Sequence, residues 1–299
     1  FIKRLYINNF IKEERMKLLK SAASLGGEIL GIDLSQKLNQ EQIKFLNQCW
    51  DERLVLVFKK QNLDDNKLIN FSKNFGELDP PGPNPYGIKF LPEFPEINVI
   101  SNVKNKEGTP IGNLGDGEAV WHADMTYQEI PPKAGILYAL EVPENQGNTH
   151  FANMTLAYDE LPYRLKEKID GKILIHDSAH NSAGMLRKGY SEVNNPSETP
   201  GARHPIIITD KNTKKKLLFL GRRPHAYIIG MEIDESENLL DQIWEHATQE
   251  KFTWTQKWKK GDLLMWKNLN VLHKRDAFDP NTRRIMHRTQ LKGEMKISA

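Results

Sequence analysis

The chain is 299 residues long, with 38% hydrophobic and 27% charged residues, which is typical of a globular protein and not of a disordered or fibrous one. Its 42 basic and 39 acidic residues leave a net charge of only +3, which argues against a nucleic-acid surface, and no apolar run is long enough to cross a bilayer. A single cysteine, Cys49, excludes an internal disulfide. The N-terminal segment lacks an apolar secretion core, so the cytoplasm is the expected location.

Helical and strand patterns alternate in the first third of the chain. Apolar residues at helical spacing predict a helix over 39–52, and the apolar run at 53–60 fits a buried strand. A second helix is expected over 64–76, with Asp64 or Asp65 as its N-cap. Neither an internal repeat nor a shift in composition marks a linker, which favours a single domain across residues 1–299.

Short β-like runs separated by turn residues dominate the rest of the chain, and two helical patterns interrupt them, at 156–169 and 234–249. Such spacing predicts a mainly β fold with peripheral helices, built as a sandwich or barrel. The β-like runs are 97–103, 134–142, 147–153, 172–178, 204–210, 216–221, 252–258, 261–268 and 283–293.

Two polar stretches interrupt this pattern. Prolines and glycines exclude regular structure from 79 to 95, and a long loop of this kind is usually functional or mobile. Residues 178–204 are polar and rich in glycine and proline, and they lie between β-like runs. This second stretch is therefore the predicted active-site lid.

The stretch "AVWHADMTY", residues 119–127, reads as a half-buried strand that would present His122 and Asp124 on one face. His273 follows an apolar strand near the C-terminus. Two histidines and one carboxylate are the facial triad of non-haem Fe(II) oxygenases. The same donors also serve zinc in hydrolases, so both metals stay open at this point.

Arg284, Met286 and Arg288 share one face of the run "RRIMHR". If the Met286 side points into the barrel, two guanidinium groups enter an apolar interior and require anions there. A dicarboxylate cosubstrate and an acidic substrate would supply them. The alternative, of equal weight from the residues alone, is a pair of surface arginines on an edge strand.

The segments "WHADMTY", "GNTHF" and "LHKRDAFDPNTRRIMHRTQ" resemble the signature segments of the Fe(II)/2-oxoglutarate-dependent taurine and 2,4-dichlorophenoxyacetate dioxygenase family. The resemblance extends over nearly the whole chain in order and spacing. It implies a double-stranded β-helix, which is a distorted jelly roll. It also implies an enzyme that uses Fe(II), 2-oxoglutarate and O2 to hydroxylate a small anionic molecule, with release of succinate and CO2.

Residue by residue, this resemblance matches His122, Asp124 and His273 to the iron ligands. Thr149 and Arg284 match the residues that hold the distal carboxylate of 2-oxoglutarate. The position of Arg288 contacts an anionic substrate group in taurine dioxygenase. Asn268 of "WKNL", where the family commonly has "WDNR", is a candidate support for the metal site.

The predicted substrate pocket departs from that of the taurine enzymes. Asn84 stands after "FGEL", where those enzymes place sulfonate-pocket residues, and Glu118 replaces an asparagine near the taurine amine. With Met125, these residues are the remaining predicted substrate contacts. The differences argue against taurine itself.

Arginines and histidines near this pocket have two readings. Arg222, Arg223 and His225 of "GRRPHAYIIG" border the substrate in relatives, but exposed arginines on a turn are the plainer interpretation. His176 and His180 are expected to be structural or lid residues, because the metal site already has three donors.

Two alternative functions remain at this stage. One is a zinc hydrolase with the same three ligands, which offers no role for Arg284. The other is a small-molecule-binding barrel that retains a metal without turnover. The expected partner is a small molecule, with no nucleic acid or membrane, and a homo-oligomer stays open.

Overall fold

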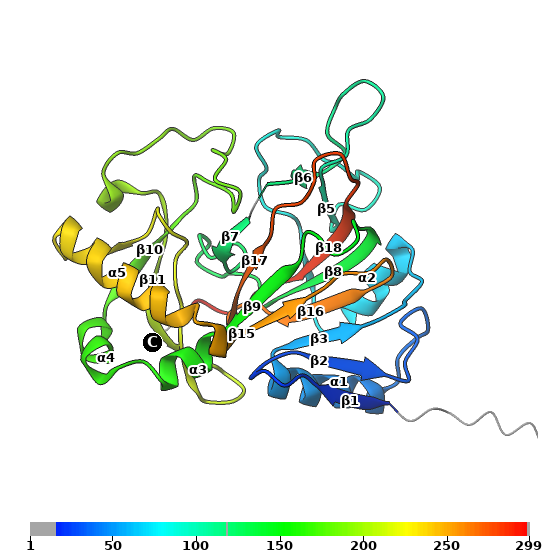
Figure 1. Cartoon of the computed structure of the whole chain (residues 1–299), viewed down its shortest axis with the longest axis horizontal. Helices are drawn as coiled ribbons and strands as arrows, with labels where there is room; N and C mark the ends of the chain where they lie inside the picture. The colour runs from blue at the N-terminus through cyan, green and yellow to red at the C-terminus, as the bar shows by residue number, and fades with distance from the viewer. Residues whose placement is uncertain (1–15, 118, 298–299) are drawn as a thin grey trace, which may run out of the picture.

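The computed structural model describes residues 16–117 and 119–297, and two β-sheets form its centre (Figure 1). The larger has nine strands in the order β1-β2-β3-β16-β8-β18-β5-β6, with β4 paired to β18. These strands are β1 (Lys17–Lys20), β2 (Gly27–Leu30), β3 (Val55–Phe58), β4 (Leu78–Asp79), β5 (Asn98–Ser101), β6 (Asn113–Leu114), β8 (Ala134–Glu141), β16 (Leu263–Lys267) and β18 (Ile285–Leu291). The smaller sheet has the order β15 (Thr253–Gln256), β9 (Thr149–Asn153), β17 (Val271–Arg275) and β7 (Ala119–His122).

Apolar side chains of both sheets form one shared core. Trp266 and Met286 of the larger sheet join Phe151 and Val271 of the smaller one, and all four are at most 2% exposed. Alternating side chains of each strand reach this core, as expected where two sheets pack face to face. His273 lies beside this core, with its ring centroid 5.1 Å from that of Trp266 and 5.8 Å from that of Phe151.

Two helices cover the outer face of the larger sheet, α1 (Gln40–Arg53) and α2 (Asp65–Lys73). Both confirm the sequence prediction. The α1 N-terminus is a capping box in which Asn39 and Gln42 bond each other's backbone. The Asp64 side chain caps α2 by accepting from the Lys67 backbone nitrogen.

A third layer lies against the other side of the molecule, where Figure 1 shows α3, α4 and α5. Its core is formed by leucine, isoleucine and aromatic side chains of these helices and the adjacent strands. The elements are α3 (Met154–Asp159), α4 (Tyr163–Ile169), α5 (Ile233–Ala247), β10 (Ile173–Asp177), β11 (Gly201–Pro205), β12 (Ile207–Thr209), β13 (Lys216–Leu218), β14 (Tyr227–Ile228) and the 3-10 turns η1 (Pro196–Glu198) and η2 (Glu250–Phe252).

The structure confirms a mainly β fold with peripheral helices, but it corrects the predicted strand over 119–127. The strand β7 ends at His122, and residues 124–127 form a turn in which Met125 has a φ of +51°. Asp124 therefore lies in the turn after β7 and not on a strand face, although its carboxylate still lies beside His122 as predicted. The segment 178–204, predicted to be irregular, contains η1 and the beginning of β11.

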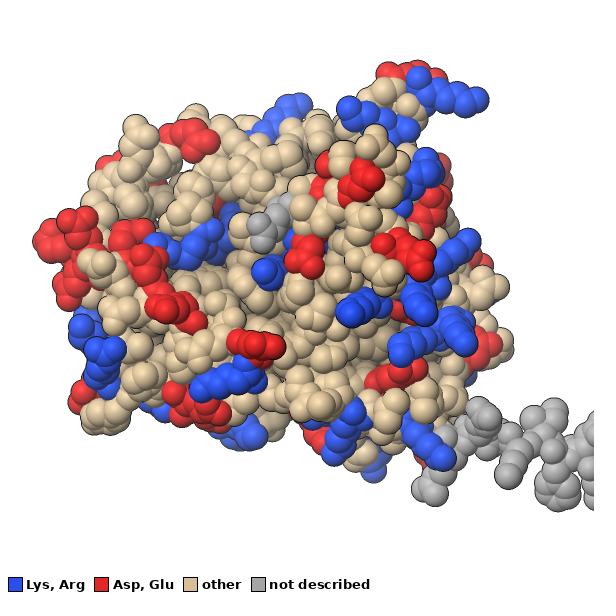
Figure 2. Space-filling view, in the orientation of Figure 1, with Lys and Arg blue, Asp and Glu red and all other residues tan. Residues whose placement is uncertain are grey.

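Charges on the surface follow the sequence analysis. On the face that Figure 2 shows, basic and acidic side chains are intermixed over most of the surface. Among the described residues, none of the helices has both the length and the apolar character to span a membrane.

Candidate active site

Strand register brings two histidines together. His122 of β7 and His273 of β17 are direct partners in the antiparallel ladder, and their ring centroids lie 4.2 Å apart. The turn after β7 adds Asp124, whose carboxylate oxygens lie 3.6 Å from His122 Nε2 and 3.9 Å from His273 Nε2. All three side chains are buried, and their donor atoms lie within 4.8 Å of one another.

The turn that carries Asp124 is fixed by Asn268. The Asn268 side-chain oxygen accepts from the Asp124 backbone nitrogen at 2.7 Å, and its amide nitrogen donates to the carbonyls of Asp124 and Pro132 at 2.8 Å. Asn268 is fully buried at the end of β16. These three bonds hold the carboxylate opposite the two imidazoles, which gives a structural basis for the support role predicted for Asn268.

The electrostatics of this trio suit a metal cation. Burial, with His122 beside it, lowers the pKa of His273 to about 3, so its ring is neutral and can offer a lone pair. His122 Nδ1 lies 2.7 Å from the Val120 carbonyl oxygen, so Nδ1–H donates there and Nε2 stays free toward Asp124. Burial alone would raise the pKa of Asp124, but Arg288 and the two rings hold it well below its usual value.

A cationic compartment adjoins the histidines on one side. Arg284 and Arg275 both face it, and burial lowers the pKa of each, that of Arg275 to about 10. Neither has a carboxylate oxygen within 4.0 Å among the described residues, and the Nε of each has no hydrogen-bond partner there. Thr149 lines the same compartment, and its hydroxyl oxygen accepts from Trp258 Nε1 at 2.9 Å, which leaves its proton free to donate.

The first residue of "GNTHF", Gly147, lies directly beside Arg284. Its φ is +60°, and a Cβ at this position would lie 3.3 Å from Arg284 Nε. Only glycine adopts this conformation at little cost and lets the backbone pass so close to the guanidinium. The compartment therefore has the positive charge and the hydrogen-bond donors to hold a carboxylate. The two imidazoles and the carboxylate beside it could provide the ligand atoms for a metal ion.

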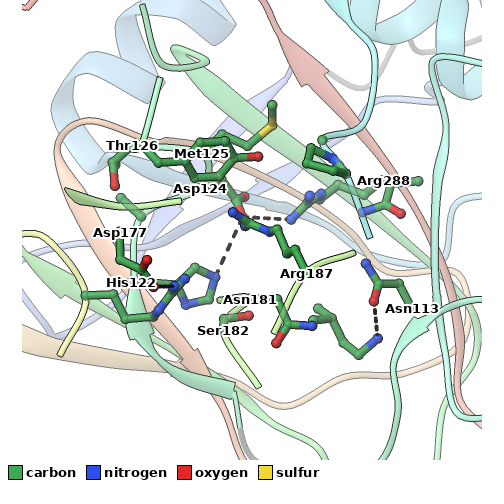
Figure 3. A pocket seen from close by; sticks show the side chains of 17 residues that line it. Asn113, His122, Asp124, Met125, Thr126, Asp177, Asn181, Ser182, Arg187 and Arg288 are labelled. Carbon is green, nitrogen blue, oxygen red and sulfur yellow. Dashed lines mark hydrogen bonds and ion pairs between the residues drawn. The ribbon is translucent and has the colours of Figure 1, made fainter. Parts of the chain in front are cut away.

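A second compartment also has His122 in its lining, and Figure 3 shows the side chains around it. Arg288 extends from β18 into it and donates from Nη1 to Asp124 Oδ1 at 2.8 Å. His122 and Arg288 line both compartments. The other side chains around it include Asn98, Asn113, Met125, Thr126, Tyr127, Asp177, Asn181, Ser182, Arg187 and Arg222.

The predicted substrate residues have different outcomes. Met125 lies in the lining of this second compartment. The structure does not bring Asn84 there, because its side chain bonds the backbone of Tyr86 and Ile88 within its own loop. Glu118 lies outside the described residues.

The arginines of "GRRPHAYIIG" point in different directions. Arg222 faces the second compartment and donates to Asp177 Oδ2 at 3.1 Å and to the His180 carbonyl at 2.6 Å. Arg223 instead pairs with Glu237 and Asp241 on the surface of α5. The plainer reading, exposed arginines on a turn, is therefore wrong for Arg222, and Arg223 is only partly exposed in its ion pairs.

The histidines outside the metal site pack among other side chains. His180 stacks on His225 with ring centroids 3.9 Å apart and lies 2.9 Å from Asp177, while His176 is fully buried against Phe219. Both oxygens of Asp177 already accept hydrogen bonds, Oδ1 from the Ala179 backbone and Oδ2 from His180 and Arg222, so these groups are arranged as a structural network.

Sequence reasoning missed Arg187 and Asp177 as lining residues. Arg187 lies inside 178–204, where no periodicity indicates which side chains turn inward. Asp177 ends β10, and its orientation is determined by contacts with Arg222 and His180. A cluster of charged residues in a polar segment was the only signal in the sequence.

Two imidazoles and one carboxylate on a β scaffold are the donor set found in mononuclear non-haem oxygenases, and the three side chains here could hold a metal ion. The sequence matches the family described as "Taurine catabolism dioxygenase TauD, TfdA family" over residues 17–290. The chain belongs to this family of 2-oxoglutarate-dependent dioxygenases.

Individual relatives and solved structures agree with this assignment. The alpha-ketoglutarate-dependent 2,4-dichlorophenoxyacetate dioxygenase of Burkholderia sp. (strain RASC) is 30% identical over 274 residues, which cover 89% of this chain and 91% of the relative. An alkylsulfatase of Acinetobacter baylyi is 27% identical over 298 residues, 96% of this chain and 88% of that protein.

A crystal structure of AAD-2 in complex with Mn(II) and N-oxalylglycine has a TM-score of 0.76 and 28% identity, and the match covers 95% of this chain and 99% of that one. A crystal structure of a taurine dioxygenase from Burkholderia xenovorans has a TM-score of 0.75 and 27% identity, and the match covers 93% of this chain and 90% of that one. These matches confirm the jelly-roll fold.

Proposed function

We propose that this chain uses Fe(II), 2-oxoglutarate and O2 to hydroxylate a small anionic organic molecule. One observation supports it most: buried arginines line two spaces beside His122, Arg275 and Arg284 in one and Arg187 in the other, and both His122 and Arg288 line the two spaces. An oxygenase of this class must hold a dicarboxylate cosubstrate and a substrate on different sides of one metal. A zinc hydrolase needs only one of these spaces.

His122, Asp124 and His273 would hold the metal through Nε2, a carboxylate oxygen and Nε2. Bound Fe(II) would supply the oxidation, in which one oxygen atom of O2 enters the substrate as a hydroxyl and the other enters succinate as 2-oxoglutarate loses CO2. Three protein donors leave coordination positions for the cosubstrate and O2. The relatives named for phenoxyacetate and sulfate ester substrates support an anionic substrate.

Thr149 and Arg284 would bind the distal carboxylate of 2-oxoglutarate, and Arg275 adds a second buried positive charge beside it. Arg288 would bind an anionic group of the substrate, with Met125 in the same wall. Paired hydrogen bonds from guanidinium groups orient a carboxylate or sulfonate more strictly than a single charge does. Each arginine thus orients one of the two reactants.

Residues 178–204 would serve as a lid over the substrate compartment. Within this segment, the Ser182 carbonyl accepts from the Val120 backbone nitrogen and the Ala202 backbone nitrogen donates to the Tyr127 carbonyl, so the segment is bonded both to β7 and to the turn that follows it. Covering the compartment excludes water from the oxidation. A single dioxygenase domain over 1–299, a cytoplasmic location and the state of association remain predictions.

The test is succinate formation and O2 uptake with Fe(II) and 2-oxoglutarate. We expect both to depend on added Fe(II), and Asp124→Ala to lose at least 100-fold in rate, because a carboxylate ligand of the metal is gone. The surface variant Asp159→Ala is the matched control and should equal the parent. Full activity of Asp124→Ala would contradict the ligand assignment, and hydrolysis that proceeds with zinc in the absence of O2 would support the alternative class.

A further inference from the structure

Arg187 carries a charge in the substrate compartment that the described residues do not neutralise. It is 8% exposed, and none of its nitrogens has a carboxylate oxygen within 4.0 Å among those residues. Nη1 donates to the Ser178 carbonyl at 2.6 Å, the guanidinium lies 4.2 Å above the Tyr127 ring, and Nε has no partner. Burying an unpaired cation is costly, so the site is prepared for an anion.

The other two arginines of the compartment already have carboxylate partners. Arg222 pairs with Asp177, and Arg288 pairs with Asp124. Asp124 is also the carboxylate of the metal site, so a bound cation takes up its negative charge and leaves Arg288 in need of an anion as well. Arg187 and Arg288 then form two separate positive points in one compartment.

Unpaired hydrogen-bond donors surround these two arginines. The Tyr127 hydroxyl, Asn181 Nδ2 and Arg288 Nε are buried and have no partner among the described residues. All three groups line the same compartment as Arg187, and Figure 3 shows Arg187, Asn181 and Arg288 around one space. A ligand rich in acceptor oxygens would satisfy them, and an apolar ligand would leave them unpaired.

We propose that the primary substrate is a small organic dianion, with one anionic group held by Arg288 and the second by Arg187, Tyr127 and Asn181. This inference rests on the proposed function, because it assigns the substrate of that same site. Arg187 belongs to residues 178–204, the proposed lid. Its contact with the second anionic group would therefore also bind the lid to the substrate.

The experiment compares pairs of closely related anions in which the second member carries one additional carboxylate charge. Protein loaded with Mn(II) and N-oxalylglycine, an unreactive analogue of 2-oxoglutarate, is titrated by calorimetry with three pairs of probes. The pairs are hexanoate and hexanedioate, propane-1-sulfonate and 3-sulfopropanoate, and phenoxyacetate and 4-carboxyphenoxyacetate. We expect the dianion of at least one pair to bind at least 10-fold more tightly, which is the size of one charge-assisted contact.

Variants of Arg187 identify the group responsible. Arg187→Gln should reduce the preference for that dianion to less than twofold, while the Kd values of the monoanion and of N-oxalylglycine stay within twofold of the parent. Arg187→Lys should keep part of the preference. Arg203→Gln, an exposed arginine of the same segment, is the control for general electrostatics and should keep all of it. Thermal unfolding shows that each variant is folded.

Two results would overturn the inference. One is that no dianion binds more tightly than its monoanion, and the other is that Arg187→Gln weakens both members of a pair equally, as a purely structural arginine would. Failure of the proposed function has a different readout, because the Fe(II) protein would then form no succinate from 2-oxoglutarate with any probe. Succinate release stimulated by monoanions alone would keep the proposed function and reject the dianion.

Discussion

Asn268 offers a quantitative test of how the metal site is supported. Replacing it with alanine removes three hydrogen bonds of 2.7 to 2.8 Å and leaves the Asp124 amide and two carbonyls unpaired in a fully buried place. Each bond to such a group is worth about 1 kcal/mol, and an unpaired buried group costs about 1 to 3 kcal/mol. Three groups are left unpaired, so we expect Asn268→Ala to lower the free energy of unfolding by at least about 3 kcal/mol, measured in urea without metal.

The same change should loosen the turn that carries Asp124, and we expect metal affinity to fall about 10-fold to 100-fold. The matched control is Asn270→Ala, two residues further along, whose side chain makes one bond to Asp210 at 2.7 Å. That variant should lose about 1 kcal/mol and keep its Mn(II) affinity. Equal Mn(II) affinities in the two variants, measured on folded protein, would refute the supporting role of Asn268.

Three further outcomes follow from the structure. Arg284→Gln should raise the KM for 2-oxoglutarate at least 10-fold and that for the substrate less than twofold, and Arg288→Gln should show the reverse in the same succinate assay. Gly135→Ala should cost about 1 to 3 kcal/mol of unfolding free energy in urea, because its new methyl group meets the Trp266 ring. Bonds to two lysines lower the pKa of Glu294 to about 2 from 4.5, so its stabilisation is complete above pH 4.5 and is lost as the pH falls toward 2. Because Glu294 is half exposed, Glu294→Gln should cost only about 0.5 kcal/mol at pH 7 and nothing at pH 2 in the same unfolding measurement.

Local signals in the sequence predicted those elements that local interactions determine. Asp64 caps α2 through a bond to a backbone three residues away, and apolar periodicity places the buried face of α1. Alternation along "RRIMHR" likewise predicted that Arg284, directly before β18, and Arg288 share a face with Met286, and the structure buries all three. For these elements, a window of a few residues contains the interactions that decide the conformation.

The orientation of Asp124 depends on a contact that no local window contains. The strand pattern predicted that it shares a strand face with His122. Instead, Asp124 lies in a turn in which Met125 has a positive φ. A hydrogen bond with Asn268, which is 144 residues further along the sequence, stabilises this turn. His122 and Asp124 still meet, for a different reason than alternation. Tertiary hydrogen bonding overrode the β pattern here, as it often does at functional sites.

Arg187 illustrates the same limit for the substrate side. Its segment is polar and without periodicity, so the sequence predicts that an arginine there is exposed to solvent. In the structure, however, Arg187 is only 8% exposed. Two contacts hold its side chain inward: a hydrogen bond to the Ser178 carbonyl of its own segment, and packing on the ring of Tyr127 in the turn that follows β7. The turn that places Asp124 therefore also places the ring against which Arg187 packs. Because one short turn positions both the proposed metal ligand and the arginine proposed to bind substrate, we expect a change in that turn to alter metal binding and substrate selection together.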